Sequence, residues 1–565
     1  MLDRRVLLQG LLFALFCTLF LNAPSVWQAA HGHAGSALHV KLLQPDSVRY
    51  LSRMKEIVDG YPLMGNPVLK EYRTGVSPTG FIEMLVAVPM WLTGADLSSA
   101  IFWSNFLFPI LTITLLFLWI RSLFGDTFLA IATIVSMSFS FGGLIEDVNP
   151  KLTLVPLGLY LCTVFLPEKP TRLPLLVRGM LLGLLFHSYS YHWTLILTFE
   201  CITILHALVA RQKPLYEVIK EAAYVLVPFM LIITPYALTL FSLHATPAFS
   251  DLWRHWGVIP TRFLAAPLLQ AQLLLWLVPL IVARRVGILT DDRSRTLLFL
   301  ILAGLIAVNS NLITGKEAEF AGHYGRVMAL FLFPALYLLL RATASRVLTR
   351  TVALVMMIVV VASYVALIPG LVTRAESAEL QWQKSGYEAL FTWLDHNVPQ
   401  ESVILAPYDL AGEIPLFTRD YVFMSAQARF FPVTDDELMD RYLALVAFFP
   451  EDRQSIASGV MPVFGNYAGS LYAKERSLHQ LRMLFRDSFQ KTLPDFIVRQ
   501  DLLRRYAEES EHPDWSSVRA TLARFELDYL VTQNVPPASV ADRFQKLATV
   551  GSFSIYHYLP SHELR

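Results

Sequence analysis

Long apolar stretches separated by short polar segments dominate the first two thirds of the chain. A helix crosses the hydrocarbon core of a bilayer with roughly 20 apolar residues. The segment 79–94 is apolar but short, and Pro89 interrupts it, so we expect it to lie at the membrane interface, with a true span as the alternative. The pattern predicts about eleven membrane-spanning helices, over residues 6–24, 101–120, 127–144, 151–167, 174–190, 192–210, 222–242, 263–283, 296–312, 327–341 and 351–372.

The pattern changes after Thr373. Charged residues are only 16% of the chain, against about a quarter in soluble domains, and most of the deficit precedes Arg374. We therefore expect an α-helical polytopic membrane domain, 1–373, with a first outer loop at about 25–100, and a C-terminal soluble mixed α/β domain, 374–565. In the soluble domain, short apolar or alternating runs predict strands at 402–406, 528–532 and 552–558, and helical periodicity appears at 435–448 and 478–492.

Basic residues in the short loops indicate the orientation. With Arg4 and Arg5 inside, the loops on that side are richer in Lys and Arg than the opposite ones. We therefore expect a multi-pass protein of the plasma or inner membrane, with a cytoplasmic N-terminus and an extracytoplasmic soluble domain. If 79–94 also crossed, the basic clusters would face the wrong side. The first apolar stretch resembles a secretory signal peptide as well, but we expect a retained helix because many spans follow.

Composition excludes some classes of partner and site. The formal net charge of +1 gives no reason to expect nucleic acid as a partner. The three cysteines, Cys17, Cys162 and Cys201, all lie in apolar runs. None is placed for a disulfide in the soluble domain or for a zinc cluster.

The first outer loop contains Asp46, Arg49, Tyr50 and Arg53 at three- and four-residue spacing. A helix would place these side chains on one face. A carboxylate beside two guanidiniums stays ionised and is able to act as a base or to hold a cation. The alternative is that Asp46 only caps the helix that follows.

The second outer loop contains adjacent acids, Glu146 and Asp147, followed by Asn149 and Lys151. Carboxylates next to lipid are costly unless they are solvated or paired, which makes them candidates for function. An ordinary solvated loop explains them equally well.

Two further clusters fall on the outer side in this topology. The run 187–193 contains His192 among aromatic residues that also suit an interfacial belt. The run 314–326 contains Lys316, His323, Tyr324 and Arg326, whose cations suit a phosphate. Internal pairing with the acids of the same run is the alternative.

Acids in two outer loops and phosphate-capable cations in a third are the arrangement required by an enzyme that takes a phosphate-linked donor from the bilayer. A transporter or flippase for a lipid-linked or small solute is the alternative. That class predicts ionisable residues deep within spans, broken helices and internal repeats. The sequence places polar groups mainly at outer helix ends and contains no visible repeat.

The chain resembles the GT-C glycosyltransferases, multispan enzymes that use polyprenyl-phosphate sugars, and particularly the bacterial protein-mannosyltransferases and arabinosyltransferases. The resemblance rests on three features: the run 45–51 just after the first span, the run 121–126 that closes the second, and the acidic pair 146–147 after the third. It covers roughly residues 1–330 in layout.

The resemblance implies that Asp46 is the catalytic carboxylate and that Glu146 and Asp147 are a second acidic site. In some members this second site helps to bind a divalent cation such as Mg²⁺ or Mn²⁺. Here the two acids are adjacent rather than separated by one residue, so the resemblance leaves the metal open. It implies a cell-envelope transferase that moves sugar from a polyprenyl-phosphate donor to a glycan, lipid or protein acceptor.

Overall fold

The computed structural model describes residues 4–31, 36–42, 45–61, 65–74, 81–140, 148–166, 171–211, 213–256, 258–260, 262, 267–317, 323–454, 461–464 and 499–559. Glu146, Asp147 and the helical periodicity expected at 478–492 lie outside the described residues.

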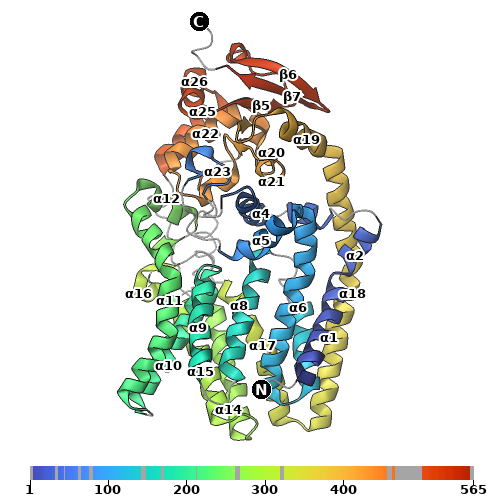
Figure 1. The fold of residues 1–565 in the computed structure, drawn as a ribbon, viewed down its shortest axis with the longest axis vertical. Coiled ribbons are helices and arrows are strands. Elements are labelled where there is room, and N and C mark those ends of the chain that lie inside the picture. Colours follow the sequence, from blue (N-terminus) through green and yellow to red (C-terminus); the bar gives the residue numbers. More distant parts are fainter. Residues whose placement is uncertain are drawn as a thin grey trace, which may run out of the picture.

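A bundle of apolar helices forms one end of the molecule and the soluble domain forms the other (Figure 1). Each expected span corresponds to a helix or, for 263–283, to two helices that meet at Trp276. Among the described residues, six helical segments are long and apolar enough to cross a membrane: 4–21, 97–124, 190–209, 215–244, 291–314 and 346–385. The bundle helices are α1 (Arg4–Leu21), α6 (Leu97–Phe124), α7 (Thr127–Ser140), α8 (Val148–Phe165), α9 (Arg172–Phe186), α10 (Ser190–Val209), α11 (Leu215–His244), α13 (Pro267–Leu275), α14 (Leu277–Arg285), α15 (Asp291–Val308), α16 (Asn311–Thr314), α17 (His323–Thr343) and α18 (Arg346–Ser385).

Small residues allow α9 and α11 to pack closely against each other. A Cβ atom at Gly179 of α9 would lie 2.2 Å from the carbonyl oxygen of Val225 in α11. One at Gly183 would lie 2.8 Å from Ile232. A larger residue at either position would separate α9 from α11. Glycine at these two positions therefore permits the close approach of α9 and α11.

The longest helix, α18, joins the bundle to the soluble domain (Figure 1). Its 40 residues span about 60 Å, twice the thickness of a hydrocarbon core. The helix therefore crosses the apolar layer and extends well beyond it. It is followed by α19 (Tyr387–Asn397), the first helix of the soluble domain.

A five-stranded sheet with the order β4-β3-β5-β7-β6 forms the centre of the soluble domain. The strands β4 (Tyr421–Val422), β3 (Val403–Leu405) and β5 (Tyr529–Thr532) are parallel, and β7 (Phe553–Tyr558) and β6 (Phe544–Val550) continue the sheet antiparallel. The strands expected at 402–406, 528–532 and 552–558 and the helix expected at 435–448, which is α22 (Asp435–Phe448), are confirmed. The other elements are α20 (Tyr408–Ala411), α21 (Ile414–Phe417), η4 (Ala426–Phe430), η5 (Pro450–Asp452), α23 (Met461–Phe464), α25 (Gln500–Glu511), α26 (Trp515–Arg524) and η7 (Ala541–Arg543).

The helices α4 (Pro45–Val58) and α5 (Met84–Thr93) of the first outer loop lie between the bundle and the soluble domain (Figure 1). Part of it belongs to the soluble core: Val68 and Leu69 are fully buried there, and the Val68 carbonyl accepts a 2.8 Å hydrogen bond from the Val422 N–H. The short helix in 79–94 has ten residues, about 15 Å, which is half of a hydrocarbon core. The loop elements are α2 (Ala23–Ala30), α3 (Ser36–Leu42), α4 (Pro45–Val58), η1 (Lys70–Tyr72), η2 (Phe81–Glu83) and α5 (Met84–Thr93).

Three small elements connect the outer ends of the later bundle helices. The amphipathic helix α12 (Pro247–His255) follows α11 and packs against η4 of the soluble domain. The strands β1 (Ile259–Pro260) and β2 (Lys316–Glu317) pair antiparallel. The ends of α11 and α15 nearest the soluble domain are thereby tied to each other and to that domain.

Candidate functional site

The helix α4 carries the first group of expected site residues. It begins at Pro45, whose fixed φ suits the first position of a helix. Asp46 is the second residue of α4, so it lies within the first turn and not at the N-cap; its side chain is outside the described residues. Arg49, Tyr50 and Arg53 follow on the same helix, as the spacing predicted.

Arg53 makes a buried ion pair with Glu83 of η2. The Arg53 Nη1 lies 3.4 Å from the Glu83 Oε1, and both side chains are 1% exposed. Burial lowers the pKa of Arg53, and the Glu83 carboxylate opposes that shift. Tyr236 of α11 also lies within electrostatic range of Arg53. The buried pair thus holds α4 against η2, close to α11.

Arg49 faces the soluble domain. Its guanidinium lies 4.3 Å from the ring centroid of Phe430, and Arg429 lies 4.7 Å from the same centroid. The Arg49 Nε is buried and has no hydrogen-bond partner among the described residues. We call Arg49, Arg53 and Arg429 the arginine site. It brings three cations from two parts of the chain to the boundary between the bundle and the soluble domain.

A histidine–tyrosine cluster forms where α9 ends and where α10 and α17 begin. The Tyr189 hydroxyl lies 2.5 Å from the His323 Nδ1, and the Tyr191 ring stacks on the His323 ring at 5.0 Å. The hydroxyls of Tyr324 and Thr194 are 2.6 Å apart. His192, 3% exposed, contacts the Tyr189 ring at 5.0 Å. The runs 187–193 and 323–324, separate in the sequence, therefore form one cluster.

Tyr236 lies between this cluster and the arginine site. Its ring centroid is 5.5 Å from that of His187 and 5.1 Å from that of Phe186. The His187 Nε2 contacts the Ile232 carbonyl at 2.9 Å, which fixes the loop against α11. Sequence reasoning missed Tyr236 because a single polar residue in an apolar stretch has no distinctive spacing.

Glu83, Arg429 and Phe430 were missed for a related reason. Glu83 lies within the segment 79–94 that was expected at the membrane interface, and Arg429 and Phe430 fall in the soluble domain, far along the chain from α4. Periodicity relates residues within an element and not between distant elements. Only a conserved pattern or a contact map would have indicated them.

The other expected site residues occupy separate places. Lys316 is exposed, and its Nζ lies 5.7 Å from the ring centroid of Trp253 in α12. Arg326 is the fourth residue of α17, and Asn149 and Lys151 lie in the first turn of α8; the side chains of all three are outside the described residues. The phosphate role expected of Lys316, His323 and Arg326 stays a prediction.

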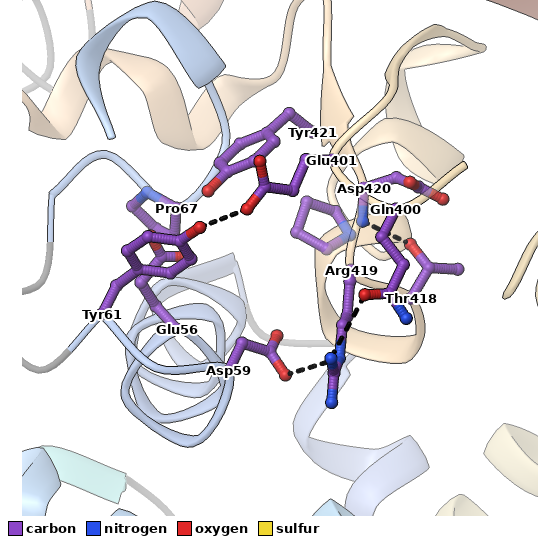
Figure 2. Close-up of a pocket in the computed structure, with 11 residues that line it drawn as sticks. Glu56, Asp59, Tyr61, Pro67, Gln400, Glu401, Thr418, Arg419, Asp420 and Tyr421 are labelled. Atoms are coloured by element: carbon purple, nitrogen blue, oxygen red, sulfur yellow. Dashed lines mark hydrogen bonds and ion pairs between the residues drawn. The ribbon is translucent and has the colours of Figure 1, made fainter. Parts of the chain in front are cut away.

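The C-terminal end of α4, Tyr61 and the segment 65–73 are fastened to the soluble domain (Figure 2). Tyr61 and Arg73 both bind the Glu401 carboxylate, which lowers its pKa. Asp59 pairs with Lys55 and lies 3.6 Å from the Arg419 Nε. These contacts hold α4 against the domain.

Glu56 faces a cavity of about 50 Å³ between α4 and the soluble domain. Its side chain is 6% exposed, and its Oε1 has no hydrogen-bond partner among the described residues. Burial raises the pKa of Glu56 to about 8, and it raises that of Asp420, which lines the same cavity, to about 7. Both carboxyls therefore hold protons close to neutral pH.

No group of three or more His, Cys, Asp or Glu side chains within the described ranges is arranged to hold a metal ion. The acids that carry the expectation of a divalent cation, Glu146 and Asp147, are outside those ranges.

An ionisable pair also lies inside the bundle, away from the helix ends where the sequence places most polar groups. The Tyr160 hydroxyl of α8 binds the Glu200 carboxylate of α10, and Glu200 is 3% exposed. Nearby, the Arg178 Nη2 of α9 donates to the Thr163 carbonyl at 2.9 Å. The sequence contained Glu200 within an apolar run, where such a residue is a candidate for function.

The fold and site together define a multispan helical membrane protein whose first outer loop is enclosed between the bundle and a soluble α/β domain. No protein-family model matches the sequence, and no curated protein matches it.

Among solved structures, the chain is similar to ArnT from Cupriavidus metallidurans bound to undecaprenyl phosphate, at 13% identity and TM-score 0.41 over 72% of this chain and 86% of that one. It is similar to the apo state of the same protein, at 14% identity and TM-score 0.42 over 71% and 85%. It is also similar to the apo oligosaccharyltransferase of Archaeoglobus fulgidus, at 12% identity and TM-score 0.48 over 94% and 70%.

Proposed function

We propose that the protein is a membrane glycosyltransferase that moves a sugar from a polyprenyl-phosphate donor to a glycan, lipid or protein acceptor on the extracytoplasmic face. The observation that carries the proposal is the placement of α4. This helix holds Asp46, Arg49 and Arg53 between the apolar bundle and the soluble domain. A lipid-linked donor meets a water-borne acceptor at such a boundary.

The arginine site suits the phosphate of the donor. Guanidinium groups bind phosphate oxygens through charge-assisted hydrogen bonds. The buried Arg49 Nε–H has no acceptor among the described residues, so it is able to donate such a bond. Cations at this position would also stabilise the negative charge that develops on the leaving phosphate.

Asp46 is proposed to act as the base. The acceptor hydroxyl oxygen would attack the anomeric carbon while the bond from that carbon to the phosphate oxygen breaks. Polyprenyl phosphate would leave with the electron pair, and the hydroxyl proton would pass to the Asp46 carboxylate. Glu146 and Asp147 are proposed as the second acidic element, with a Mg²⁺ or Mn²⁺ ion if they hold one.

The test is the substitution Asp46→Asn. We expect it to abolish transfer from a radiolabelled polyprenyl-phosphate sugar in proteoliposomes, because an amide accepts no proton. The exposed Glu388→Gln variant, in α19, is the control for a lost carboxylate elsewhere. Undiminished turnover in the folded Asp46→Asn protein would remove Asp46 from the mechanism.

The buried Glu200 and the helix break at Trp276 favour a second candidate, a transporter or flippase. Movement of a fluorescent polyprenyl-phosphate lipid across proteoliposomes separates the two functions. If the protein is a transporter, we expect Glu200→Gln to stop this movement. If it is a transferase, we expect the same variant to retain sugar transfer.

A further inference from the structure

A second cavity, of about 350 Å³, lies where three parts of the molecule meet. Its walls come from the outer-loop segment 65–74, from the junction of α11 and α12, and from residues 431–434 of the soluble domain. Ligand pockets are typically about 300–1,000 Å³ and lie between parts of a fold. We call this space the junction cavity.

The side chains around the junction cavity are mostly neutral. None of the described residues that line it is Lys or Arg, so it offers a phosphate no counter-ion. The one carboxylate, Glu71, is paired with Arg441, whose Nη2 lies 2.8 Å from the Glu71 Oε1. Leu243 and Phe431 contribute apolar surface, and Thr74, Thr246 and Thr434 contribute hydroxyl-bearing side chains. The Tyr72 hydroxyl donates to the Glu437 carboxylate. Apolar surface beside neutral hydrogen-bonding groups matches the chemistry of a sugar ring.

Asn66 supplies a donor in the wall of the cavity. Its Oδ1 accepts hydrogen bonds from the N–H groups of Val68 and Leu69, both at 3.0 Å, so the orientation of the amide is determined. The Asn66 Nδ2 is buried and has no hydrogen-bond partner among the described residues, and the residue is 2% exposed. A buried donor without a partner costs about 1–3 kcal/mol. A ligand oxygen that reached this Nδ2 from the cavity would remove that cost.

The junction cavity adjoins both the membrane and the arginine site. Leu243, in its wall, lies at the outer end of α11, where the neighbouring Leu238 and Phe241 are 65% and 83% exposed. Phe431 lines the cavity, while the preceding residue, Phe430, contacts Arg49. A ligand in the cavity is therefore close to the lipid surface. It would contact Phe431, whose neighbour in the sequence, Phe430, contacts the Arg49 assigned to the donor phosphate.

We infer that the junction cavity binds a neutral sugar unit of the acceptor, with the Asn66 amide donating to one of its oxygens. The assignment of this sugar to the acceptor rests on the proposed function, but sugar binding in the cavity is testable without any transfer reaction. It deepens that proposal by assigning the acceptor to the carbohydrates.

The experiment measures binding of neutral methyl pyranosides, namely glucoside, mannoside, galactoside and N-acetylglucosaminide, to the full-length protein in phosphatidylcholine nanodiscs by saturation-transfer NMR. We expect saturation of at least one of them. Ala248→Trp, which fills the cavity from α12, should reduce the signal at least fivefold. Ser250→Trp, at an exposed position of the same helix, should leave it unchanged.

A second variant tests the amide directly. Asn66→Asp keeps the oxygen that binds Val68 and Leu69 and removes the Nδ2 donor, so we expect at least a threefold weaker signal with an unchanged fold. The inference is overturned if no pyranoside is saturated, if Ala248→Trp binds as well as wild type, or if glucose 1-phosphate displaces the neutral sugars more strongly than they displace one another. Pyranoside binding that Ala248→Trp removes, in a protein that transfers no sugar from the labelled donor, would support the site and refute the proposed transferase.

Discussion

Arg53 and Glu83 are both charged and both 1% exposed, so each depends on the other for its place in the structure. Removal of one partner of a buried pair leaves an uncompensated charge and costs about 3–5 kcal/mol. Replacement of both by apolar residues of similar volume is often close to neutral. This difference separates the structural role of Arg53 from a role in binding phosphate.

We expect Glu83→Gln to lower the free energy of unfolding by about 3 kcal/mol, measured by chemical denaturation of the purified protein. The double variant Arg53→Met with Glu83→Leu should recover most of that stability. It should nevertheless lose at least tenfold in donor transfer, because the cation is gone. Full activity in the stable double variant would exclude Arg53 from the site.

Glu56 should make the stability of the folded protein depend on pH. Its pKa is raised from 4.5 to about 8 in the folded protein by burial, with Asp59, Lys55, Tyr421 and Glu401 as its other neighbours. Between these two values the folded protein holds a proton that the unfolded chain has lost. Stability therefore falls as pH rises from about 4.5 to about 8 and is constant above that range.

The measurement is thermal unfolding between pH 5 and pH 9. We expect the wild-type Tm to fall by about 5 °C over this range and the Glu56→Gln variant to show a clearly smaller fall. Asp420, Glu413 and Asp452, whose pKa values burial raises to about 7, about 8 and about 6, contribute slopes of the same sign to the fall that remains. Equal slopes in wild type and variant would show that Glu56 is ionised in the folded protein.

At the scale of elements, α12 is the clamp between the bundle and the soluble domain. His255 of α12 lies 2.7 Å from the Asp435 Oδ1 through its Nε2 and 2.9 Å from the Arg429 carbonyl through its Nδ1. The Arg254 Nη2 donates to the Asp435 Oδ2 at 2.9 Å. The same clamp therefore positions η4, which contributes Arg429 and Phe430 to the arginine site.

We expect Asp435→Asn to destabilise the protein by about 3 kcal/mol, because it removes the charge that faces Arg254 and His255 in a buried place. Asp436→Asn is the matched control. It changes the next residue of α22, whose side chain is 59% exposed and pairs with Arg499 at the surface, and should cost less than about 1 kcal/mol. Hydrogen exchange of η4 and α12 reports the effect, and equal protection in both variants would contradict the clamp.

For the whole molecule, orientation in the membrane remains a prediction from the basic loops. We expect Leu547→Cys, at an exposed position of β6, to react in intact cells with a membrane-impermeant maleimide. Val286→Cys, exposed after α14 on the opposite side, should react only after the membrane is opened. The reverse pattern would place the soluble domain inside and remove the extracytoplasmic site.

The sequence by itself determined the elements of this protein. Hydrophobic runs indicated the spans, and short apolar or alternating runs indicated β3, β5 and β7, because burial in lipid or in a sheet demands those patterns locally. The helical face with Arg49, Tyr50 and Arg53 was indicated for the same reason. Each of these features depends on residues close together in the chain.

Only the tertiary structure decided which elements meet. Glu83 beside Arg53, Phe430 beside Arg49 and Tyr236 beside His187 join residues from distant elements. Such contacts result from packing, such as the close approach of α9 and α11 at Gly179. Periodicity holds no information on them, because one helical face packs equally well against many partners until the rest of the chain selects one.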